Sequence, residues 1–157
     1  MAVLNQYICQ LDPILHTFPH VRQKSAFLFS AILTASAKAF NPVLYEKLYN
    51  HAQDLFTKSF RHGTKSTETV QAILILTYWK EPQDSRVWTS VGHAIRLCFD
   101  MGWHRLAPYD PQKQTSETES ARRALRNIER TWYVLFVYDR RYVEPSQCFN
   151  EDRARSH

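Results

Sequence analysis

The amino-acid sequence predicts an all-α fold, built as one multi-helix domain of about six helices. Apolar residues recur at helical spacing through most of the chain, and its 157 residues with 44% hydrophobic content suit one folded domain. Residues 72–79 taken alone could form a buried strand, because periodicity does not separate strand from helix over so short a run. Their helical neighbours and the lack of other strand candidates favour a helix.

The first third of the chain predicts a short helix and a turn over residues 1–20, followed by a longer helix over residues 21–40. Asp12-Pro13 and Pro19 interrupt any early helix, because proline removes a backbone donor and restricts the residue before it. Asn41-Pro42 ends the longer helix.

The next predicted helix, over residues 44–60, has an apolar stripe opposite a charged face. Gly63 is a plausible stop, because glycine adopts the left-handed conformation that ends many helices. The stripe consists of Leu44, Tyr45, Leu48, Ala52, Leu55, Phe56 and Phe60.

Residues 67–79 predict the central, buried helix of the domain. Ser66 can cap its first turn, and Glu68 lies near the positive end of the helix dipole. The segment is apolar nearly all round from Val70 to Trp79, which is typical of a helix surrounded by others.

After a polar turn, residues 87–101 predict a helix in which Trp88 shares the apolar face with Val91 and Ala94. Gly92 in mid-helix costs about 1 kcal/mol relative to alanine, so we expect a neighbouring helix to approach it closely. Gly102 is the predicted left-handed residue after the helix, which would let Trp103 fold back. The helix would pack tightly and antiparallel against the one before it.

The last predicted helix begins after a capping box at residues 116–119 and runs to about residue 140. Leu125, Ile128, Trp132 and Leu135 continue an apolar stripe. Residues 131–138 are apolar all round, so we expect the second half of this helix to enter the core. The helical domain would span residues 1–141, and residues 142–157 would form a polar tail.

Composition excludes several classes of protein. The net charge of +5 is spread along the chain, which does not predict a nucleic-acid surface. No signal peptide is recognisable, and the longest uncharged stretch, residues 25–37, is shorter than the roughly 18 residues that suggest a membrane span. Cys9, Cys98 and Cys148 are too scattered for a disulfide framework, so we expect a soluble protein in a reducing compartment.

No set of residues in the sequence predicts catalysis, a cofactor or a metal ion. His16 and His20 have the spacing of paired metal ligands, but Pro19 lies between them, and structural histidines are the simpler interpretation. His104 could serve as a base after a helix end, yet it lacks a recognisable nucleophile or carboxylate partner. We therefore expect no enzyme.

Two groups of side chains leave alternatives open. Trp79, Trp88, Trp103 and Trp132 could line a ligand pocket, but core packing is the commoner role. Arg122, Arg123, Arg126 and Arg130 could bind an acidic partner or form a solvated helix face. Two local ion pairs are also expected, Arg96 with Asp100 and Asp139 with Arg140.

Five blocks occur in a characteristic order: Val70 to Ala72, Trp88, Gly92 to Arg96, Gly102 to Arg105, and Glu129 to Arg140. In this order they resemble the middle homology, or regulatory, region of fungal zinc-cluster transcription factors. The resemblance covers about residues 11–140. Its motif residues, which we expect to be structural, are Gln71, Trp79, Trp88, Gly92, Arg96, Gly102, His104, Arg105, Glu129, Arg130, Trp132, Asp139 and Arg140.

The resemblance implies an all-helical, non-catalytic regulatory domain involved in control of RNA polymerase II transcription. It implies a nuclear location and contacts with other parts of the parent regulator or with co-regulators, and a small-molecule effector is possible. Direct DNA contact and membrane contact are not expected. The alternative is a small-molecule-binding or enzymatic domain with a tryptophan-rich pocket.

The chain departs from the family pattern in two ways. It lacks the six closely spaced cysteines that hold zinc in the DNA-binding module, so zinc is expected only in that absent cluster. The chain also turns polar after Arg140, and we expect it to be a fragment or truncated product.

Overall fold

The computed structural model describes residues 11–106 and 118–143, with side chains described up to Arg140. Within these ranges it contains six α-helices and one short 3-10 helix, and no strand. The prediction of an all-α domain is therefore confirmed. The helices are α2 (Phe18–Lys24), α3 (Ala26–Phe40), α4 (Pro42–Arg61), α5 (Thr67–Tyr78), α6 (Val87–Asp100), η1 (Trp103–Arg105) and α7 (Glu119–Val143).

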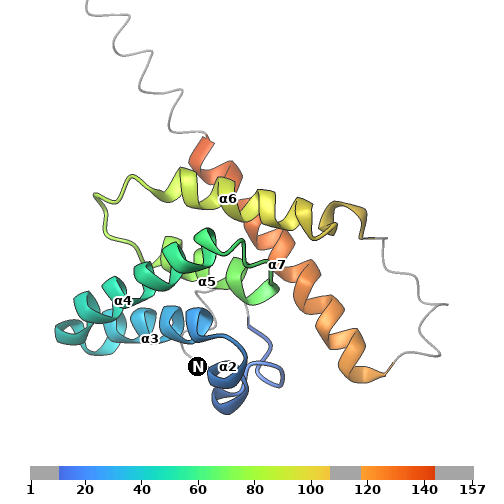
Figure 1. The fold of residues 1–157 in the computed structure, drawn as a ribbon, viewed down its shortest axis with the longest axis horizontal. Coiled ribbons are helices and arrows are strands. Elements are labelled where there is room, and N and C mark those ends of the chain that lie inside the picture. Colours follow the sequence, from blue (N-terminus) through green and yellow to red (C-terminus); the bar gives the residue numbers. More distant parts are fainter. Residues whose placement is uncertain (1–10, 107–117, 144–157) are drawn as a thin grey trace, which may run out of the picture.

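Helix α5 is the centre of the fold, as the sequence predicts. It lies between the α3–α4 pair and the α6–α7 pair (Figure 1), and it contacts α3, α6 and α7. Every residue from 69 to 77 is buried. Ser66 caps the helix, since its hydroxyl accepts a hydrogen bond from the backbone N–H of Thr69 at 3.1 Å.

The predicted single helix over residues 21–40 is wrong. Pro19 lies in the first turn of α2, where backbone N–H groups make no intrahelical hydrogen bond. The lack of an N–H therefore costs nothing there, and Pro19 is compatible with the start of a helix. Ser25 then adopts an extended conformation, and its hydroxyl accepts from the N–H of Leu28 at 3.1 Å. This cap separates α2 from α3.

Two glycines take the positive φ expected of them. Gly63 has φ 60° after α4, and Gly102 has φ 76° after α6. Trp103, directly after Gly102, is buried in η1, and its ring lies 6.5 Å from that of Trp132. The predicted helix ends are therefore confirmed.

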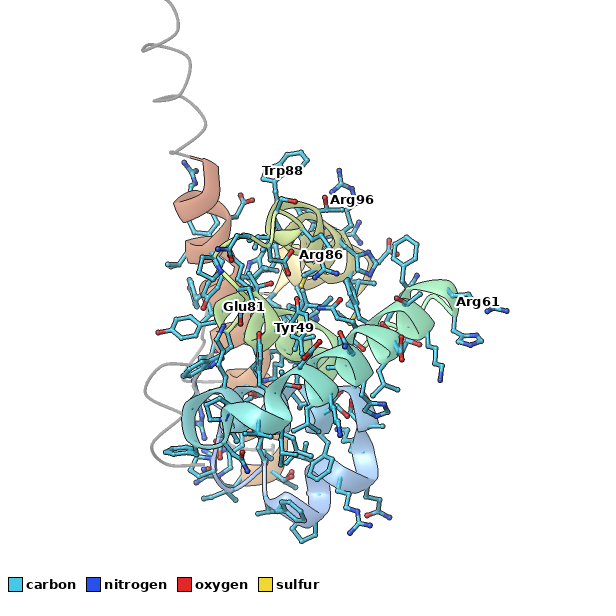
Figure 2. The ribbon with its side chains drawn as sticks, turned by 90° about the vertical axis from the view of Figure 1, so that its left-hand side faces the viewer. Tyr49, Arg61, Glu81, Arg86, Trp88 and Arg96 are labelled. Carbon is cyan, nitrogen blue, oxygen red and sulfur yellow. The ribbon has the colours of Figure 1, made fainter. Side chains whose placement is uncertain are left out.

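Three predictions for α6 are wrong. Trp88 is 69% exposed, because the covered stripe is narrow, and the buried residues Val87, Val91 and Ala94 leave Trp88 outside it. Figure 2 shows Trp88 projecting away from the helices. A Cβ at Gly92 would meet only Arg96 Nη1, at 3.3 Å, so no neighbouring helix approaches it.

The expected pair between Arg96 and Asp100 does not form either. Arg96 Nη1 donates to the carbonyl oxygen of Gly92 at 3.0 Å, while Asp100 pairs with Lys65 at 3.0 Å.

The N–H of Ala121 donates to Thr118 Oγ1 at 3.3 Å, so Thr118 caps α7. Ser116 of the predicted capping box lies outside the described residues.

The second half of α7 is covered on one side only, contrary to the prediction that it enters the core. Leu135 is fully buried, but Tyr133 is 70% exposed, Phe136 53% and Val137 54%. Helices α5 and α6 cover the side of Leu135, and no described residue covers the other. We call Tyr133, Phe136 and Val137 the α7 outer patch.

Candidate functional site

A buried polar cluster joins the segment before α2 to helices α5 and α7. It consists of Asp12, His16, Gln71, Asn127 and Thr131, which we call the core network; all five are buried. Gln71 is its centre. Its Nε2 donates to Asn127 Oδ1 at 3.0 Å and to Thr131 Oγ1 at 3.2 Å, and its Oε1 faces His16 Nε2 at 3.2 Å.

Each end of the core network is tied to the backbone. His16 Nδ1 lies 3.0 Å from the carbonyl oxygen of Asp12, and the Thr131 hydroxyl donates to the carbonyl oxygen of Asn127 at 2.7 Å. Asp12 Oδ1 accepts from the backbone N–H groups of Ile14 and Leu15. Buried polar groups that lose a partner are costly, so these bonds fix how α7 lies on α5.

The carboxylate of Asp12 is held in its charged form. Burial raises its pKa, but the two backbone donors and Arg123 together outweigh burial and leave the pKa below its ordinary value. Arg123 Nη1 lies 3.5 Å from Asp12 Oδ2, and its Nε pairs with Glu119 at 3.1 Å. The arginines on the first half of α7 thus have local acidic partners, as Arg122 and Arg126 also pair with Glu119.

A second polar cluster holds the loop between α5 and α6 against α3 and α4. Lys38 Nζ donates to the carbonyl oxygens of Trp79 and Lys80 at 2.9 and 2.8 Å and pairs with Glu81 at 2.8 Å. A lysine ammonium at the carbonyl end of α5 satisfies groups that have no intrahelical partner. Tyr49, Glu81 and Arg86 gather at this loop (Figure 2).

Asp84 is the charged centre of this second cluster, which we call the loop clamp: Lys38, Tyr49, Glu81, Asp84 and Arg86. Tyr49 donates to Asp84 Oδ2 at 2.6 Å, and Arg86 donates to both carboxylate oxygens. Arg86 in particular holds the pKa of Asp84 far below its ordinary value. Burial, with the nearby Asp84 carboxylate, raises the pKa of Tyr49 to about 12.

The structure does not bring the thirteen motif residues together into one site. Gln71 is in the core network, Trp79 caps the end of α5, and Trp132 packs its ring against Phe99 and Trp103. The other motif residues lie at helix ends or on helix surfaces. They are Trp88, Gly92, Arg96, Gly102, His104, Arg105, Glu129, Arg130, Asp139 and Arg140.

The candidate catalytic and metal-binding histidines have structural surroundings. His16 is buried in the core network, whereas His20 is exposed. His104 is exposed, stacks on Phe99 at 5.0 Å and accepts a hydrogen bond from Arg105 Nε at 3.1 Å. Among the described residues no group of three or more His, Cys, Asp or Glu side chains could hold a metal ion.

The tryptophans do not form a shared ligand pocket in the cavities beside the two polar clusters. A cavity of about 230 Å³ adjoins the core network and one of about 40 Å³ adjoins the loop clamp, and no tryptophan lines either. Trp103 is buried, Trp79 and Trp132 are partly buried and Trp88 is exposed.

No helix in the described part of the chain is long and apolar enough to cross a membrane.

The sequence alone did not identify Asn127 and Thr131 as partners of Gln71. The available signal was two polar residues, four apart, on the face of α7 that also carries the buried Leu135. A polar residue within an apolar stripe requires a buried partner, but the sequence does not say which one, and Gln71 lies 56 and 60 residues away.

Comparison with known proteins matches residues 9–143 to the fungal specific transcription factor domain. The chain is 40% identical to protein priB of Lentinula edodes over 87% of its length and 22% of that protein. It is 31% identical to transcriptional regulatory protein SEF1 of Candida albicans over 72% of its length and 13% of that protein, and 28% identical to cutinase transcription factor 1 beta of Fusarium vanettenii over 75% and 14%.

These curated relatives are much longer, and the chain spans 22% or less of each. No solved structure matches the chain significantly.

Proposed function

The chain belongs to the fungal specific transcription factor domain family, and on that premise we propose that it is a non-catalytic regulatory domain acting in the nucleus by protein contact. The family match over residues 9–143 carries this proposal. Relatives named as transcription factors or transcriptional regulators support it. We propose that the domain itself needs no metal ion or cofactor.

The α7 outer patch is the surface we propose for the protein contact. Large apolar side chains on one exposed helix face commonly mark sites of protein interaction. Tyr133, Phe136 and Val137 have the spacing by which one helix packs against another, and Arg140 lies over the Phe136 ring at 5.1 Å. The partner would be an amphipathic helix from another part of the parent regulator or from a co-regulator.

A reporter assay tests this function. The chain would be placed between a heterologous DNA-binding module and an activation domain, and we expect it to change reporter output several-fold. Phe136→Asp should abolish that change, because a charge on the α7 outer patch opposes an apolar contact.

Leu125→Asp is the matched control, because Leu125 is also an exposed apolar residue of α7 but lies among the arginines of the first half. It should leave the reporter effect intact at equal protein abundance. An unchanged reporter with the chain present, or equal effects of the two substitutions, would contradict the proposal.

A fluorescent fusion of a longer regulator carrying this domain tests the nuclear location.

A further inference from the structure

We propose that Thr64, in the loop between α4 and α5, is a phosphorylation site for an arginine-directed protein kinase. Such kinases recognise an arginine three residues before the acceptor hydroxyl, because acidic groups on the kinase pair with that arginine. Arg61 lies three residues before Thr64. The site depends on α4 and the loop after it, so it stands or falls independently of the α7 outer patch.

Three sequences among the described residues have this spacing, and the structure distinguishes between them. A kinase binds the residues from the arginine to the one after the acceptor in an extended conformation. Any of these residues that lies in a helix must therefore unwind before the hydroxyl can react. The three segments are residues 22–26 around Ser25, residues 61–65 around Thr64 and residues 86–90 around Thr89.

The Thr64 segment needs the least unwinding. Arg61 is the last residue of α4, and residues 62–65 lie outside helices, because α5 begins at Thr67. The N–H of Thr64 donates to the carbonyl oxygen of Ser59 at 2.9 Å, a hydrogen bond at the end of α4. Exposed hydrogen bonds at a helix end open at little cost in free energy. Only one helical residue has to leave its helix for this segment to extend.

The two side chains that a kinase would bind in this segment are free. Thr64 and Arg61 are exposed, and neither side chain makes a hydrogen bond or ion pair with another residue in the described part of the chain. Figure 2 shows Arg61 at the end of α4, apart from the other labelled residues. The kinase therefore displaces no side-chain contact when it binds the arginine and the hydroxyl.

The Ser25 segment is held by two helices. Residues 22–24 belong to α2, and α3 begins directly after Ser25. Ser25 is only partly exposed, and its hydroxyl caps α3 by accepting from the N–H of Leu28 at 3.1 Å. A kinase would have to unwind the end of α2 and remove the cap of α3.

The Thr89 segment is held by the loop clamp and by the core. Thr89 is exposed, but residues 87–90 form the first turn of α6, and Val87 in that turn is buried. Arg86, which the kinase would have to bind, donates to both carboxylate oxygens of Asp84 at 2.9 and 2.8 Å. The fold therefore favours Thr64 over both other hydroxyls.

The reaction at Thr64 would be transfer of the γ-phosphoryl group of ATP. A bond forms between Thr64 Oγ1 and the γ-phosphorus, and the bond from that phosphorus to the leaving oxygen of ADP breaks. The hydroxyl proton passes to the catalytic carboxylate of the kinase. The products are ADP and phosphothreonine, which carries a charge of about −1.5 to −2 at pH 7.

The folded chain can accommodate this charge. Thr64 lines an open groove together with Lys58 and with Lys24 and Glu68, which pair at 2.9 Å. Lys58 is exposed and has no acidic partner among the residues that the structure describes. The nearby start of α5 is the positive end of its helix dipole. A phosphate here meets an unpaired positive charge and no unpaired negative one in the groove.

Rates of phosphorylation in the full, folded chain test the proposal. The chain would carry Ser156→Ala, because Arg153 precedes Ser156 at the same spacing outside the described residues. Calcium/calmodulin-dependent protein kinase II with magnesium ATP is the probe, and mass spectrometry follows the phosphate on each hydroxyl. Synthetic peptides of residues 19–31, 58–70 and 83–95 measure the kinase's own preference for each sequence.

The decisive quantity is the rate in the chain divided by the rate in the peptide, because all three hydroxyls are accessible in the peptides. We expect this ratio to be at least about tenfold higher at Thr64 than at Ser25 or Thr89. Similar ratios at the three sites would overturn the proposal. Phosphorylation of Thr64 in the peptide but not in the chain would also overturn it, as would a peptide of residues 58–70 that the kinase does not phosphorylate.

Arg61→Ala tests recognition of the arginine and should lower the rate at Thr64 in the chain by at least about tenfold, because it removes a charge-assisted contact with the kinase. Lys47→Ala is the matched control: Lys47 is another exposed cation of α4 outside residues 61–65, and its replacement should leave the rate unchanged. An unchanged rate in Arg61→Ala, or an equal loss in the two variants, would refute recognition by an arginine-directed kinase.

Discussion

Helix α5 and the second half of α7 are both apolar nearly all round, yet the fold treats them differently. Residues 69–77 of α5 are buried on every side, whereas α7 buries Leu135 and exposes Tyr133, Phe136 and Val137. α5 has helices on several sides, and the described part of the chain covers α7 on one side only. Apolar composition thus indicates how much surface a helix can bury, and the neighbours decide how much it does bury.

The largest test of this contrast compares Leu74→Ala in α5 with Val137→Ala in α7. Leu74 is 1% exposed, so its truncation should lower the free energy of unfolding by about 2 to 5 kcal/mol through lost burial and a cavity. Val137 is 54% exposed, and its truncation should change that free energy by no more than about 0.5 kcal/mol. Urea denaturation measures both, and similar losses would contradict the contrast.

A smaller effect is expected where α7 is bonded to α5 through the core network. Thr131→Val keeps the side-chain shape but removes the hydroxyl that accepts from Gln71, and should cost about 1 to 3 kcal/mol. Thr57→Val is the matched control, because the Thr57 hydroxyl donates to a carbonyl four residues earlier, as Thr131 does, on an exposed surface. Equal losses in the two variants would refute the stabilising role of the core network.

The free energy of unfolding should depend on pH through Asp84, which lies in the loop between α5 and α6. Because the folded-state pKa of Asp84 lies below its ordinary value of 3.8, its stabilising contribution is present above that pH and is lost as the pH falls toward the folded-state pKa. The unsubstituted chain should lose free energy of unfolding between about pH 5 and about pH 2. In Asp84→Asn that loss should be smaller by on the order of 1 kcal/mol.

Circular dichroism during urea denaturation at each pH measures this dependence. Glu81 is a comparison residue for the same loop: Lys38 lowers its pKa, but Glu81 is exposed and Glu81→Gln should change the acid dependence less. The loop clamp would have no special role if the two substitutions acted alike.

The smallest expected effect concerns Trp88, which the sequence places on the apolar face of α6 and the fold leaves 69% exposed. Trp88→Ala should change the free energy of unfolding by less than about 0.5 kcal/mol, although a buried tryptophan would cost about 3 to 5 kcal/mol. A loss in that higher range would show that Trp88 is covered in the folded protein.

Much of the fold could be predicted because its signals are local. Ser66 caps α5 with its own hydroxyl, and Gly63 and Gly102 take left-handed conformations that need no partner from elsewhere in the chain. The split at Ser25 was missed although it is also local, because residues 21–26 contain no proline or glycine that would mark a helix end before the Ser25 cap.

The candidate site was less predictable. Asn127 and Thr131 are identifiable as polar residues on a covered face, but their bonds to Gln71 join positions more than fifty residues apart. The cavity beside them exists only where α2, α5 and α7 converge. Spacing within one helix carries no information on such a convergence.

The sequence by itself determined the fold class, the central position of α5 and the family, because helix periodicity, capping residues and ordered motif blocks are all written along the chain. Only the tertiary structure decided which faces of α6 and α7 are covered, why Trp88 and Phe136 remain exposed, and that Asn127 and Thr131 bond to Gln71. Burial and hydrogen-bond satisfaction depend on neighbours in space, and those neighbours come from distant parts of the chain.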